Sequence, residues 1–556
     1  MELPCLIFED DDLLVINKPA GLNTHAPDPY AGEGIYDWLR HREPRWASLA
    51  IIHRLDKETS GLMVFGKSSV ANRSLTDQFT RRTVRKTYLL LSDRPVPQRE
   101  VVVRSKLVRV GERYVSRNSS SAQSAETLFK PVAADVRKMA CATLNAQHNS
   151  LLTQPQVTGH NVLCAEPLTG RTHQIRVHAA ERGFPILGDV LYGGTPAERV
   201  FLHSFELTIK HPRTAEPLTF RALPDFHADA RWTLRAALID AKSTNAWRLL
   251  HGAGDGCQAW YLERLGDYVL SQSETALNEV QREKLAHIMG RISARGAYHK
   301  LLTRYVRQTR PESVAASLVL GAPAPDRFGI RENGLNYELS FHEGYSAGLF
   351  LDQRDNRRRL LMGHVAAGFE LYAEKRVGAD AAEPAVLNTF AYTCGFSVAA
   401  AKAGARTTSL DLSKKYLDWG KRNFALNEID PARHDFIYGD VFDWIQRLGK
   451  KGRSYSVVLL DPPTFSQSKR SGVFRAEKDY GKLVTAALCV LQNRGVLFAS
   501  SNAAGWKPQD FLASITGAIR RGGRKIVQSH YVPQPPDFPI SRGEPAYLKT
   551  VWLRVG

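Results

Sequence analysis

The sequence has few cysteines, and none of them is paired. The six stand singly, with no Cys-x-x-Cys motif and no cysteine–histidine grouping of zinc-site spacing: Cys5, Cys141, Cys164, Cys257, Cys394 and Cys489. This pattern predicts reduced thiols and no structural metal. His173 and His178 are close in sequence, but five residues apart in a strand-like segment they would point to opposite faces, so we expect no metal there either.

Long apolar runs are also missing, and the N-terminus shows no basic-then-apolar leader. We therefore expect a soluble, cytoplasmic protein without a membrane partner. Acidic residues are in deficit, because 75 Lys and Arg stand against 56 Asp and Glu, a formal charge of +19. Such an excess favours a polyanionic partner through phosphate neutralisation and counterion release. Nucleic acid is the first expectation, and an anionic membrane surface is the alternative.

The length of 556 residues exceeds what one hydrophobic core usually organises, and 43% hydrophobic residues can supply several cores. We predict a multidomain chain of α+β and α/β parts, divided at 1–228, 229–325 and 326–556. The first part shows short strands between turn residues, typical of a mixed antiparallel sheet, with one helix at 69–81. The second is a small α+β domain with a helix at 278–291. The third alternates strand and helix, which predicts a Rossmann-like parallel sheet covered on both faces.

One carboxylate in the first part stands between two strongly apolar runs. Residues 51–52 and 62–65 read as buried strands, and Thr59-Ser60-Gly61 reads as the turn between them. Asp56 is then either a solvated turn residue or a carboxylate held in place for a functional role. The first alternative is common, because aspartate favours turns for local hydrogen-bonding reasons.

Four motifs in this part resemble those of the RluA-type pseudouridine synthases. They are His-Arg-Leu-Asp at 53–56 with Thr-Ser-Gly-Leu at 59–62, the opening strand and loop at 8–22, Arg-Lys-Thr-Tyr at 85–88, and the closing motif at 168–178 with 185–189. The resemblance implies RNA as substrate, with catalytic residues Asp56, Tyr88 and Arg176 and RNA contacts at Arg54, Arg171 and His173. Asp56 would act as nucleophile or as base, Arg176 would keep it ionised, and Tyr88 would stack on the flipped uracil. Without the motif, Tyr88 reads as a core aromatic.

The middle part resembles the small central domain of certain 23S rRNA methyltransferases, through residues 244–252, 254–256 and 264–268. Its glycines by themselves indicate only tight turns.

Acidic residues close three successive strands in the last part. Asp411 follows a strand at 407–410, Asp440 follows the next, and Asp461 opens Asp-Pro-Pro after a strand at 457–460. Because ligands bind at the carboxyl ends of such strands, Asp411 suits the hydroxyls of a ribose; the alternative is an N-cap for the next helix. The first proline holds Asp461 extended.

This part resembles the class I methyltransferases that use S-adenosyl-L-methionine, most closely the guanine-N7 methyltransferase half of a bifunctional bacterial 23S rRNA enzyme. The likeness rests on residues 348–354, 411–413, 416–419 and 461–466. It implies S-adenosyl-L-methionine as cofactor, bound by Gln353, Arg354, Asn388, Gly395, Asp411, Asp440 and Asp461. It implies a target-base site at Asp461, Pro462 and Phe465.

Two features leave the second activity open. The family's cofactor loop usually has glycine where this sequence has Cys394, so an alternative is a ribosome-assembly factor with an inactive methyltransferase half. A cytosine-C5 methyltransferase is another, but it needs a thiol nucleophile after the strand at 495–499, where none stands. We therefore favour a ring nitrogen, guanine N7, as acceptor. The RNA is expected to be rRNA, with tRNA as the alternative.

Overall fold

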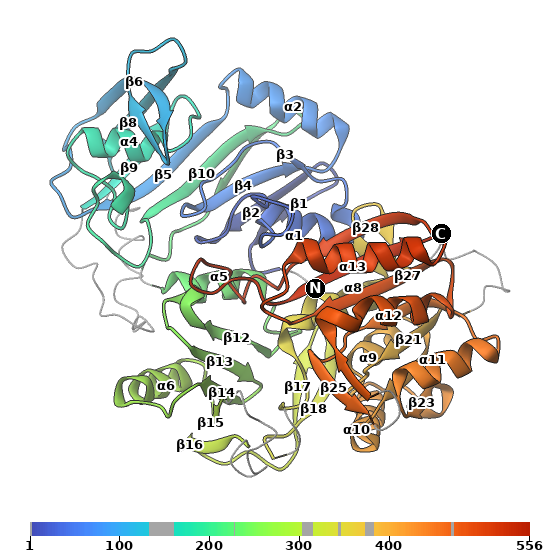
Figure 1. Cartoon of the computed structure of the whole chain (residues 1–556). Helices are drawn as coiled ribbons and strands as arrows, with labels where there is room; N and C mark the ends of the chain where they lie inside the picture. The colour runs from blue at the N-terminus through green and yellow to red at the C-terminus, as the bar shows by residue number, and fades with distance from the viewer. Residues whose placement is uncertain are drawn as a thin grey trace. The chain divides into compact units, whose positions relative to one another are not determined.

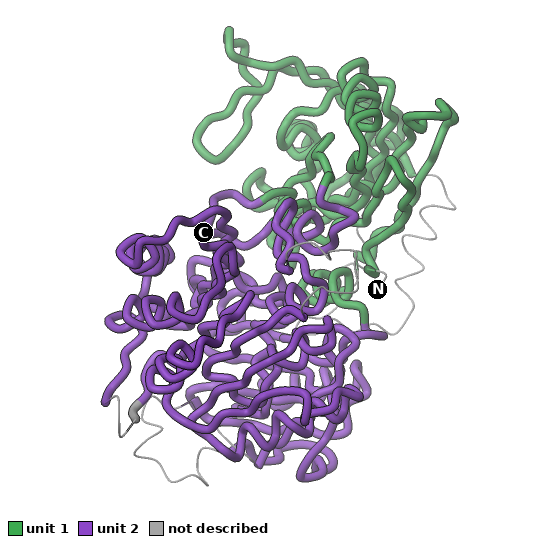
Figure 2. Tube along the Cα trace, turned by 90° about the vertical axis from the view of Figure 1, so that its right-hand side faces the viewer, with its two compact units in different colours: residues 1–25, 34–37, 48–240 green, residues 26–33, 38–47, 241–556 purple. Residues whose placement is uncertain are grey.

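The protein forms two compact units in the computed structural model, which describes residues 3–132, 161–226, 228–302, 315–342, 346–372, 383–468 and 472–556. Figure 1 shows the elements, and Figure 2 colours the two units. The first unit holds Met1–His25, Gly34–Asp37 and Ser48–Asp240; the second holds Ala26–Glu33, Trp38–Ala47 and Ala241–Gly556. The division into three domains stays a prediction. Among the described residues, no helix is both long enough and apolar enough to cross a bilayer.

The first unit is built on an eleven-stranded sheet of order β1-β2-β4-β10-β5-β9-β8-β6-β7, with β11 beside β10 and β3 beside β4. All its pairings are antiparallel except β4 with β10, which confirms the predicted mixed sheet. The strands are β1 (Leu6–Glu9), β2 (Leu13–Lys18), β3 (Ala50–Ile51), β4 (Ser60–Gly66), β5 (Arg85–Ser92), β6 (Val101–Val110), β7 (Arg113–Ser116), β8 (Gln123–Pro131), β9 (Asn161–Pro167), β10 (Leu202–Lys210) and β11 (Pro217–Arg221).

The helices of this region differ in part from the prediction. Helix α2 (Ser69–Thr80) lies where expected, and the side chain of Ser68 caps it. The expectation of a single helix in residues 1–228 is wrong, because α1 (Ile35–Arg42) and α4 (Gln174–Glu181) are also present; α5 (Ala230–Leu238) lies just beyond that range. The strand expected at 173–178 is therefore α4. Its alternation of apolar residues carries no information about a face, because all residues from Gln174 to Ala179 are buried.

The long segment of the second unit, Ala241–Gly556, begins with a five-stranded sheet of order β12-β13-β14-β15-β16. Its strands are β12 (Ala246–His251), β13 (Trp260–Leu265), β14 (Tyr268–Ser273), β15 (Gly296–Leu301) and β16 (Ser317–Gly321). The predicted helix is confirmed as α6 (Glu279–Arg291), which Asn278 and Gln281 close with a reciprocal capping box. Two short hairpins follow, β17 (Phe328–Glu332) with β18 (Leu335–Leu339) and β19 (His364–Ala366) with β20 (Phe369–Glu370).

A seven-stranded sheet of order β23-β22-β21-β24-β27-β29-β28 organises the rest of this unit. The first five strands in that order run parallel, and β29 pairs antiparallel with both β27 and β28. Helices α8, α9 and α10 pack together, and so do α11, α12 and α13. The elements are β21 (Ala385–Thr389), β22 (Arg406–Asp411), β23 (Asp435–Tyr438), β24 (Tyr455–Leu460), β27 (Leu491–Ser501), β28 (Ile526–Val532), β29 (Lys549–Val555), α8 (Arg354–Met362), α9 (Gly395–Lys402), α10 (Lys414–Ala425), α11 (Val441–Lys450), α12 (Ala476–Leu488), α13 (Pro508–Arg521) and the hairpin β25 (Phe465–Ser468) with β26 (Gly472–Arg475).

Strand β24 shows how this sheet separates two cores. Val457 and Leu459 belong to one apolar cluster, and Val458 and Leu460 belong to another. Successive side chains of a strand point to opposite faces, so each face of the sheet is buried. The predicted Rossmann-like sheet, covered on both sides, is confirmed.

Candidate active sites

Asp56 lies in the loop between β3 and β4. The turn of this loop is at Lys57 and Glu58, and Thr59 N–H donates to the Asp56 carbonyl at 3.1 Å. The turn expected at residues 59–61 is therefore wrong, because β4 already begins at Ser60. Gly61, with φ of 115°, passes so close to β10 that a Cβ atom would lie 2.3 Å from the Ser204 carbonyl oxygen. The glycine serves strand packing here rather than a turn.

Two buried side chains fix the backbone around Asp56. The Thr24 hydroxyl donates to the Leu55 carbonyl at 2.8 Å and accepts the Leu55 N–H at 3.2 Å. The Lys18 ammonium donates to the carbonyls of Leu22, at 2.8 Å, and Lys57, at 3.3 Å. Lys18 is fully buried, and this burial lowers its pKa to about 7. The loop is thus held from both sides of Asp56.

The Asp56 carboxylate faces two basic side chains from α4 and its N-cap. Arg176 Nη1 lies 3.8 Å and His173 Nε2 lies 3.9 Å from Asp56 Oδ2. Arg176 is itself oriented by Asp189, to which its Nε and Nη2 each donate at 2.7 Å. Burial disfavours the charged guanidinium, but the bond to Asp189 outweighs it, so the pKa of Arg176 is raised. Burial lowers the pKa of His173, whose Nδ1 lies 2.8 Å from the Tyr192 hydroxyl.

These residues line one cavity of about 1200 Å³ in the first unit. All six predicted residues contribute to it: Arg54, Asp56, Tyr88, Arg171, His173 and Arg176. The side chain of Asp56 keeps 26% exposure, so it is neither sealed in a core nor simply a solvated turn residue. Tyr88, on β5, is buried, and burial raises its pKa to about 12. Further cations line the cavity at Arg82, Arg85 and Lys86, which suits a polyanionic chain.

Sequence reasoning assigned no role to three residues that organise this site. Lys18 holds the loop, Asp189 orients Arg176, and Tyr192 contacts both His173 and, through its ring, Arg176 at 5.2 Å. Asp189 lies in the closing motif, next to Gly188, and Tyr192 lies three residues after it. This position was the only sequence signal for a role of either residue in the site. Lys18 lies within the opening motif at 8–22, but a lysine at the end of an apolar strand normally reads as exposed, so no structural role was assigned to it.

The loop that leads into α9 has an unusual backbone. Phe390, Tyr392 and Cys394 all have positive φ, at 55°, 49° and 64°. Such conformations are costly for residues other than glycine and persist only where the surroundings impose them. Here the Tyr392 N–H donates to Asp411 Oδ2 at 2.8 Å, and Asn423 Nδ2 donates to the Thr393 carbonyl at 2.9 Å. The loop is therefore preorganised at the carboxyl end of β21.

Cys394 occupies a space that a neighbouring glycine leaves open. Its side chain is fully buried, and a Cβ atom on Gly420 of α10 would lie 2.3 Å from its sulfur. Burial raises the pKa of the thiol to about 12, so it stays protonated. The side chain thus packs against α10, while the residue itself keeps the left-handed backbone conformation that glycine adopts freely.

Asp411 and Asp461 stand at the carboxyl ends of β22 and β24. Asp411 accepts the Ser413 N–H at 2.8 Å, but the N-cap of α10 is Ser413 itself, so Asp411 is not the cap. Asp461 Oδ2 accepts from Gln353 Nε2 at 3.3 Å, and Gln353 also donates to the Ser500 hydroxyl at 2.9 Å. Burial raises the pKa of Asp461 to about 6.

The two target-base candidates that follow differ in exposure. Pro462 is buried, whereas the Phe465 ring on β25 is 40% exposed and available to a flat partner.

Three other predicted cofactor residues have local partners of their own. Arg354 forms a bidentate pair with Asp537, at 2.9 and 2.6 Å. Asp440 caps α11 by accepting the Phe442 and Asp443 N–H groups. Asn388 Nδ2 donates to the Ser397 hydroxyl of α9 at 2.9 Å. The structure brings Gln353 together with Asp461, and it engages Arg354, Asp440 and Asn388 elsewhere; their cofactor roles stay predictions.

The chain's own residues fit a nucleoside cofactor at this edge of the sheet. Asn388 Oδ1 is buried without a hydrogen-bond partner among the described residues. Asp411 accepts from the backbone N–H groups of Tyr392, Leu412 and Ser413 but has no paired cation in the described structure, and burial raises its pKa. Gly395 is closely packed by the protein itself, since a Cβ atom there would lie 2.8 Å from the Leu349 side chain. A buried acceptor and a carboxylate are groups that such a ligand needs.

One group of side chains in the second unit has the spacing of metal ligands. The ligand atoms of Glu33, His41 and His530 lie within 4.8 Å of one another. Burial lowers the pKa of His41 to about 3, and that of His530 well below its usual value. The Arg359 guanidinium lies 3.9 Å from the Glu33 carboxylate, however, and this cation opposes a second positive charge. We assign no metal to the group, which no sequence spacing could have indicated.

Together, these features define two classes of site on one chain. The second unit has the sheet order, the preorganised loop and the strand-end acids of a transferase that binds a nucleoside cofactor. The first unit has an arginine-lined cavity around the Asp56 carboxylate, with Glu166 also in its lining.

Two protein families match these two regions. The family of RNA pseudouridylate synthases matches residues 12–181, and the family of S-adenosylmethionine-dependent methyltransferases matches residues 249–554. The second match spans more than half of the sequence. The chain belongs to the S-adenosylmethionine-dependent methyltransferase family and carries an RNA pseudouridylate synthase domain ahead of it. Its cofactor is S-adenosyl-L-methionine, and it acts on RNA.

Curated relatives agree with this assignment. A ribosomal RNA large subunit methyltransferase of Deinococcus radiodurans is 32% identical over 342 residues, covering 59% of this chain and 78% of the relative. Ribosomal RNA large subunit methyltransferase K of Neisseria meningitidis serogroup B is 39% identical and covers 32% of this chain and 46% of the relative. Ribosomal RNA large subunit methyltransferase K/L of a Psychrobacter species is 40% identical and covers 31% of this chain and 20% of the relative.

Proposed function

We propose that this enzyme modifies ribosomal RNA of the large subunit at two sites, converting a uridine to pseudouridine in the first unit and methylating guanine N7 in the second. The observation that carries the first activity is the Asp56 carboxylate, 3.8 Å from Arg176 in a cavity of about 1200 Å³. The names of the curated relatives support large-subunit rRNA as the substrate.

Asp56 is the catalytic carboxylate of the isomerisation. The reaction breaks the bond from ribose C1′ to uracil N1, turns the base and joins C1′ to C5; C5 loses a proton and N1 gains one, so no other reactant is needed. Asp56 acts as nucleophile or as base on the ribose, and Arg176, 3.8 Å from its carboxylate, orients it. The extruded uracil stacks on Tyr88 within the cavity.

In the second unit the chain's task is to align the acceptor and exclude water. S-adenosyl-L-methionine, when bound, supplies an electrophilic methyl group. Asp411 holds the ribose hydroxyls, Asn388 and Gly395 accommodate the rest of the nucleoside, and Asp440 accepts at the adenine end. Asp461, Pro462 and Phe465 hold the target base, with the exposed Phe465 ring as the stacking surface.

The cysteines favour a nitrogen acceptor over cytosine C5. Carbon 5 of cytosine needs a thiolate at carbon 6, but Cys394 is fully buried with its pKa raised to about 12. Cys489 is exposed, but it lies at the C-cap of α12, before β27 rather than after it. Guanine N7 carries a lone pair and needs no such nucleophile.

Modification mapping in cells tests the proposal. RNA from a deletion strain would be compared with RNA from strains that express the wild-type protein, Asp56→Asn or Asp411→Asn. We expect Asp56→Asn to lose only the pseudouridine, with its rate reduced by roughly 10⁴-fold or more in a purified assay. We expect Asp411→Asn to lose only the methylation, through weaker cofactor binding.

The same maps decide the class of RNA. If both marks are unchanged in large-subunit rRNA but one disappears from tRNA, then tRNA is the substrate. If Asp411→Asn retains both methylation and cofactor affinity, the cofactor site is misplaced. Wild-type protein that fails to bind S-adenosylmethionine in calorimetry would support an assembly factor instead.

A further inference from the structure

Helix α8 presents two different faces. Gln353, just before the helix, shares one face with Asn356 and Arg357, at spacings of three and four residues. Asp355, Arg358 and Arg359 share another face at the same spacings. The first face carries polar groups toward the methyltransferase site, and the second carries three charges.

The first face supports the candidate target-base and cofactor residues. Asn356 Nδ2 donates to Gln353 Oε1 at 2.8 Å, and Gln353 in turn donates to Asp461 at 3.3 Å. The Arg357 side chain packs on Gly395, where a Cβ atom would lie 3.4 Å from it. The position of α8 therefore sets the position of Gln353 and of the backbone at Gly395.

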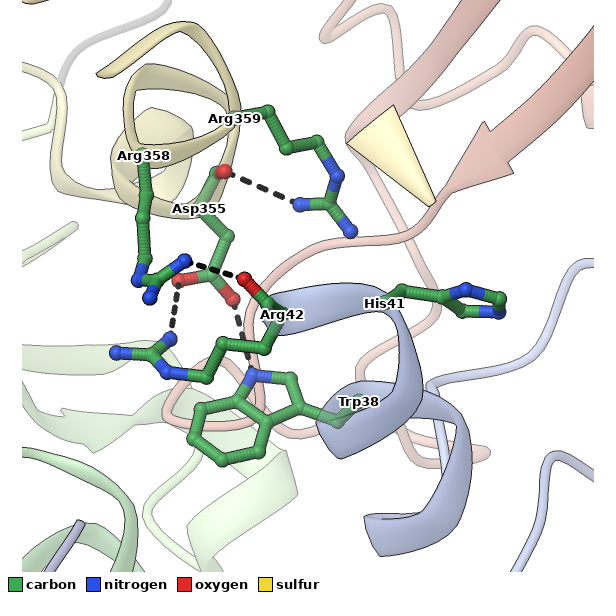
Figure 3. A pocket seen from close by; sticks show the side chains of 6 residues that line it. All are labelled: Trp38, His41, Arg42, Asp355, Arg358 and Arg359. Atoms are coloured by element: carbon green, nitrogen blue, oxygen red, sulfur yellow. Dashed lines mark hydrogen bonds and ion pairs between the residues drawn. The ribbon is translucent and has the colours of Figure 1, made fainter. Parts of the chain in front are cut away.

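The charged face is covered by residues 38–47, which belong to the second unit although they lie more than 300 positions earlier in the sequence. Trp38 Nε1 donates to Asp355 Oδ2 at 3.2 Å, and Arg42 Nη1 lies 4.0 Å from Asp355 Oδ1. Arg358 donates to the Arg42 carbonyl at 2.6 Å and pairs with Glu43. Figure 3 shows the Trp38 and Arg42 side chains converging on Asp355.

Residues 38–47 partner two of the three charges of this face, Asp355 and Arg358. Arg359 instead donates to the carbonyls of Val365 and Asp355 and lies 3.9 Å from Glu33. Asp355, Arg358 and Arg359 retain only 7%, 3% and 6% exposure, and buried charges are tolerated only when they are paired and hydrogen-bonded. Residues 38–47 lie inside the stretch that matches the RNA pseudouridylate synthases and outside the stretch that matches the methyltransferases. A segment from one family's sequence thus completes a helix of the other's site.

We propose that residues 38–47 act as a positioning segment of the methyltransferase: by holding the charged face of α8 through Trp38, Arg42 and Glu43, they place Gln353 beside Asp461 and the Arg357 side chain against Gly395. These residues touch neither substrate in this scheme, and their effect passes through α8. The inference rests on the proposed location of the cofactor site.

Trp38→Phe and Glu43→Gln test this in the full-length protein. The first removes one N–H donor and keeps an aromatic ring; the second removes one charge and keeps an acceptor. We expect each to raise KM for S-adenosylmethionine roughly tenfold through misplacement of α8, with kcat at saturating cofactor within twofold of wild type. Pseudouridine formation should stay unchanged, because neither residue lines the Asp56 cavity.

Glu9→Gln is the matched control, because Glu9 forms a comparably buried pair with Lys67 in the first unit; their side chains are 14% and 13% exposed. An unchanged KM in both test variants would overturn the proposal, as would an equal rise in Glu9→Gln. Thermal unfolding distinguishes a positioning role from a merely stabilising one. If a variant has a lower melting temperature but an unchanged KM when assayed well below that temperature, the proposal is also overturned. If Asp411→Asn leaves cofactor binding intact, the fault lies with the proposed cofactor site instead.

Discussion

Asp461 combines a strand-end position with a pKa that burial raises to about 6, while the Ser500 hydroxyl opposes the shift. Its folded-state pKa lies above the unfolded value, so its contribution to stability is fully present below about pH 4 and is lost as pH rises through 6. The bond from Gln353 is compatible with either form, but only the carboxylate offers both oxygens as acceptors to Gln353 and a base N–H together.

This predicts a pH dependence that only one activity shows. We expect kcat/KM for methylation to rise with an apparent pKa near 6 and pseudouridine formation to lack that transition. Rate profiles for both activities, measured on the same preparation between about pH 5 and 8, check this. Asp461→Asn should remove the transition; a profile that keeps it would assign the titration to another group.

Cys394 and Gly420 form a complementary pair, because the thiol fills the space that a side chain on Gly420 would occupy. A Cβ atom on Gly420 would lie 2.3 Å from the sulfur and 2.8 Å from Cys394 Cβ. We therefore expect Gly420→Ala to destabilise the second unit by about 1–3 kcal/mol through overpacking. Scanning calorimetry of the transition that S-adenosylmethionine shifts upward provides the measurement.

A double-mutant cycle isolates this contact. In a Cys394→Gly background the clash is absent, so Gly420→Ala should cost less than about half as much as in the wild type. Equal costs in both backgrounds would show that the thiol is not what confines Gly420. Cys394→Gly alone also replaces a strained left-handed residue by the one that adopts it freely.

At the scale of elements, those with local sequence signals were predictable, and those set by tertiary contacts were not. Helices α2 and α6 were predictable because Ser68 and Asn278 cap them and their apolar spacing is helical. Helix α4 was not, because Ile175 and Val177 alternate as in a strand while every position around them is buried.

The backbone at Phe390, Tyr392 and Cys394 carried no signal, since only contacts distant in sequence impose it. The pairing of Asp56 with Arg176 followed from the motifs; their support by Asp189 did not.

The pairing of Arg176 with Asp189 joins α4 to the segment that follows it. This pairing predicts a large effect for one substitution. Asp189→Asn removes the bidentate carboxylate partner of the buried Arg176 and leaves it only the Asp56 carboxylate at 3.8 Å. We expect a loss of about 3–5 kcal/mol in the stability of the first unit, and pseudouridine formation slower by about 10²-fold. Denaturant unfolding and single-turnover rates measure the two effects.

Asp77→Asn is the matched control, because Asp77 pairs with Arg81 on the surface of α2, with 54% and 72% exposure of the two side chains. It should cost less than about 1 kcal/mol. A similar cost for both substitutions would mean that the Arg176–Asp189 pair contributes nothing beyond a surface contact.

At the scale of the whole molecule, the formal charge of +19 predicts an RNA affinity that falls with salt concentration. Besides Arg176, the Asp56 cavity is lined by five cations, Arg54, Arg82, Arg85, Lys86 and Arg171. If each meets a phosphate, the slope of log affinity against log salt concentration should be about −3.5 for single-stranded RNA. Filter binding of an RNA fragment over a range of salt concentrations measures it.

Single substitutions show which cations contribute. Arg85→Gln should make the slope shallower by about 0.7. Arg81→Gln should not change it, because Arg81 is equally exposed but lies outside the cavity. A slope that both substitutions change equally would mean that the general charge of the surface, rather than the cavity, holds the RNA.

The placement of residues 38–47 has a practical consequence for anyone dissecting this bifunctional chain. The long continuous segment of the second unit starts at residue 241. A truncation there would remove Trp38, Arg42 and Glu43, so the charged face of α8 would lose these partners. Expressed alone, such a fragment should be poorly soluble or a weak catalyst even if its Rossmann sheet forms. Supplying the missing peptide in trans, or grafting it onto the new amino terminus, would be the rational repair.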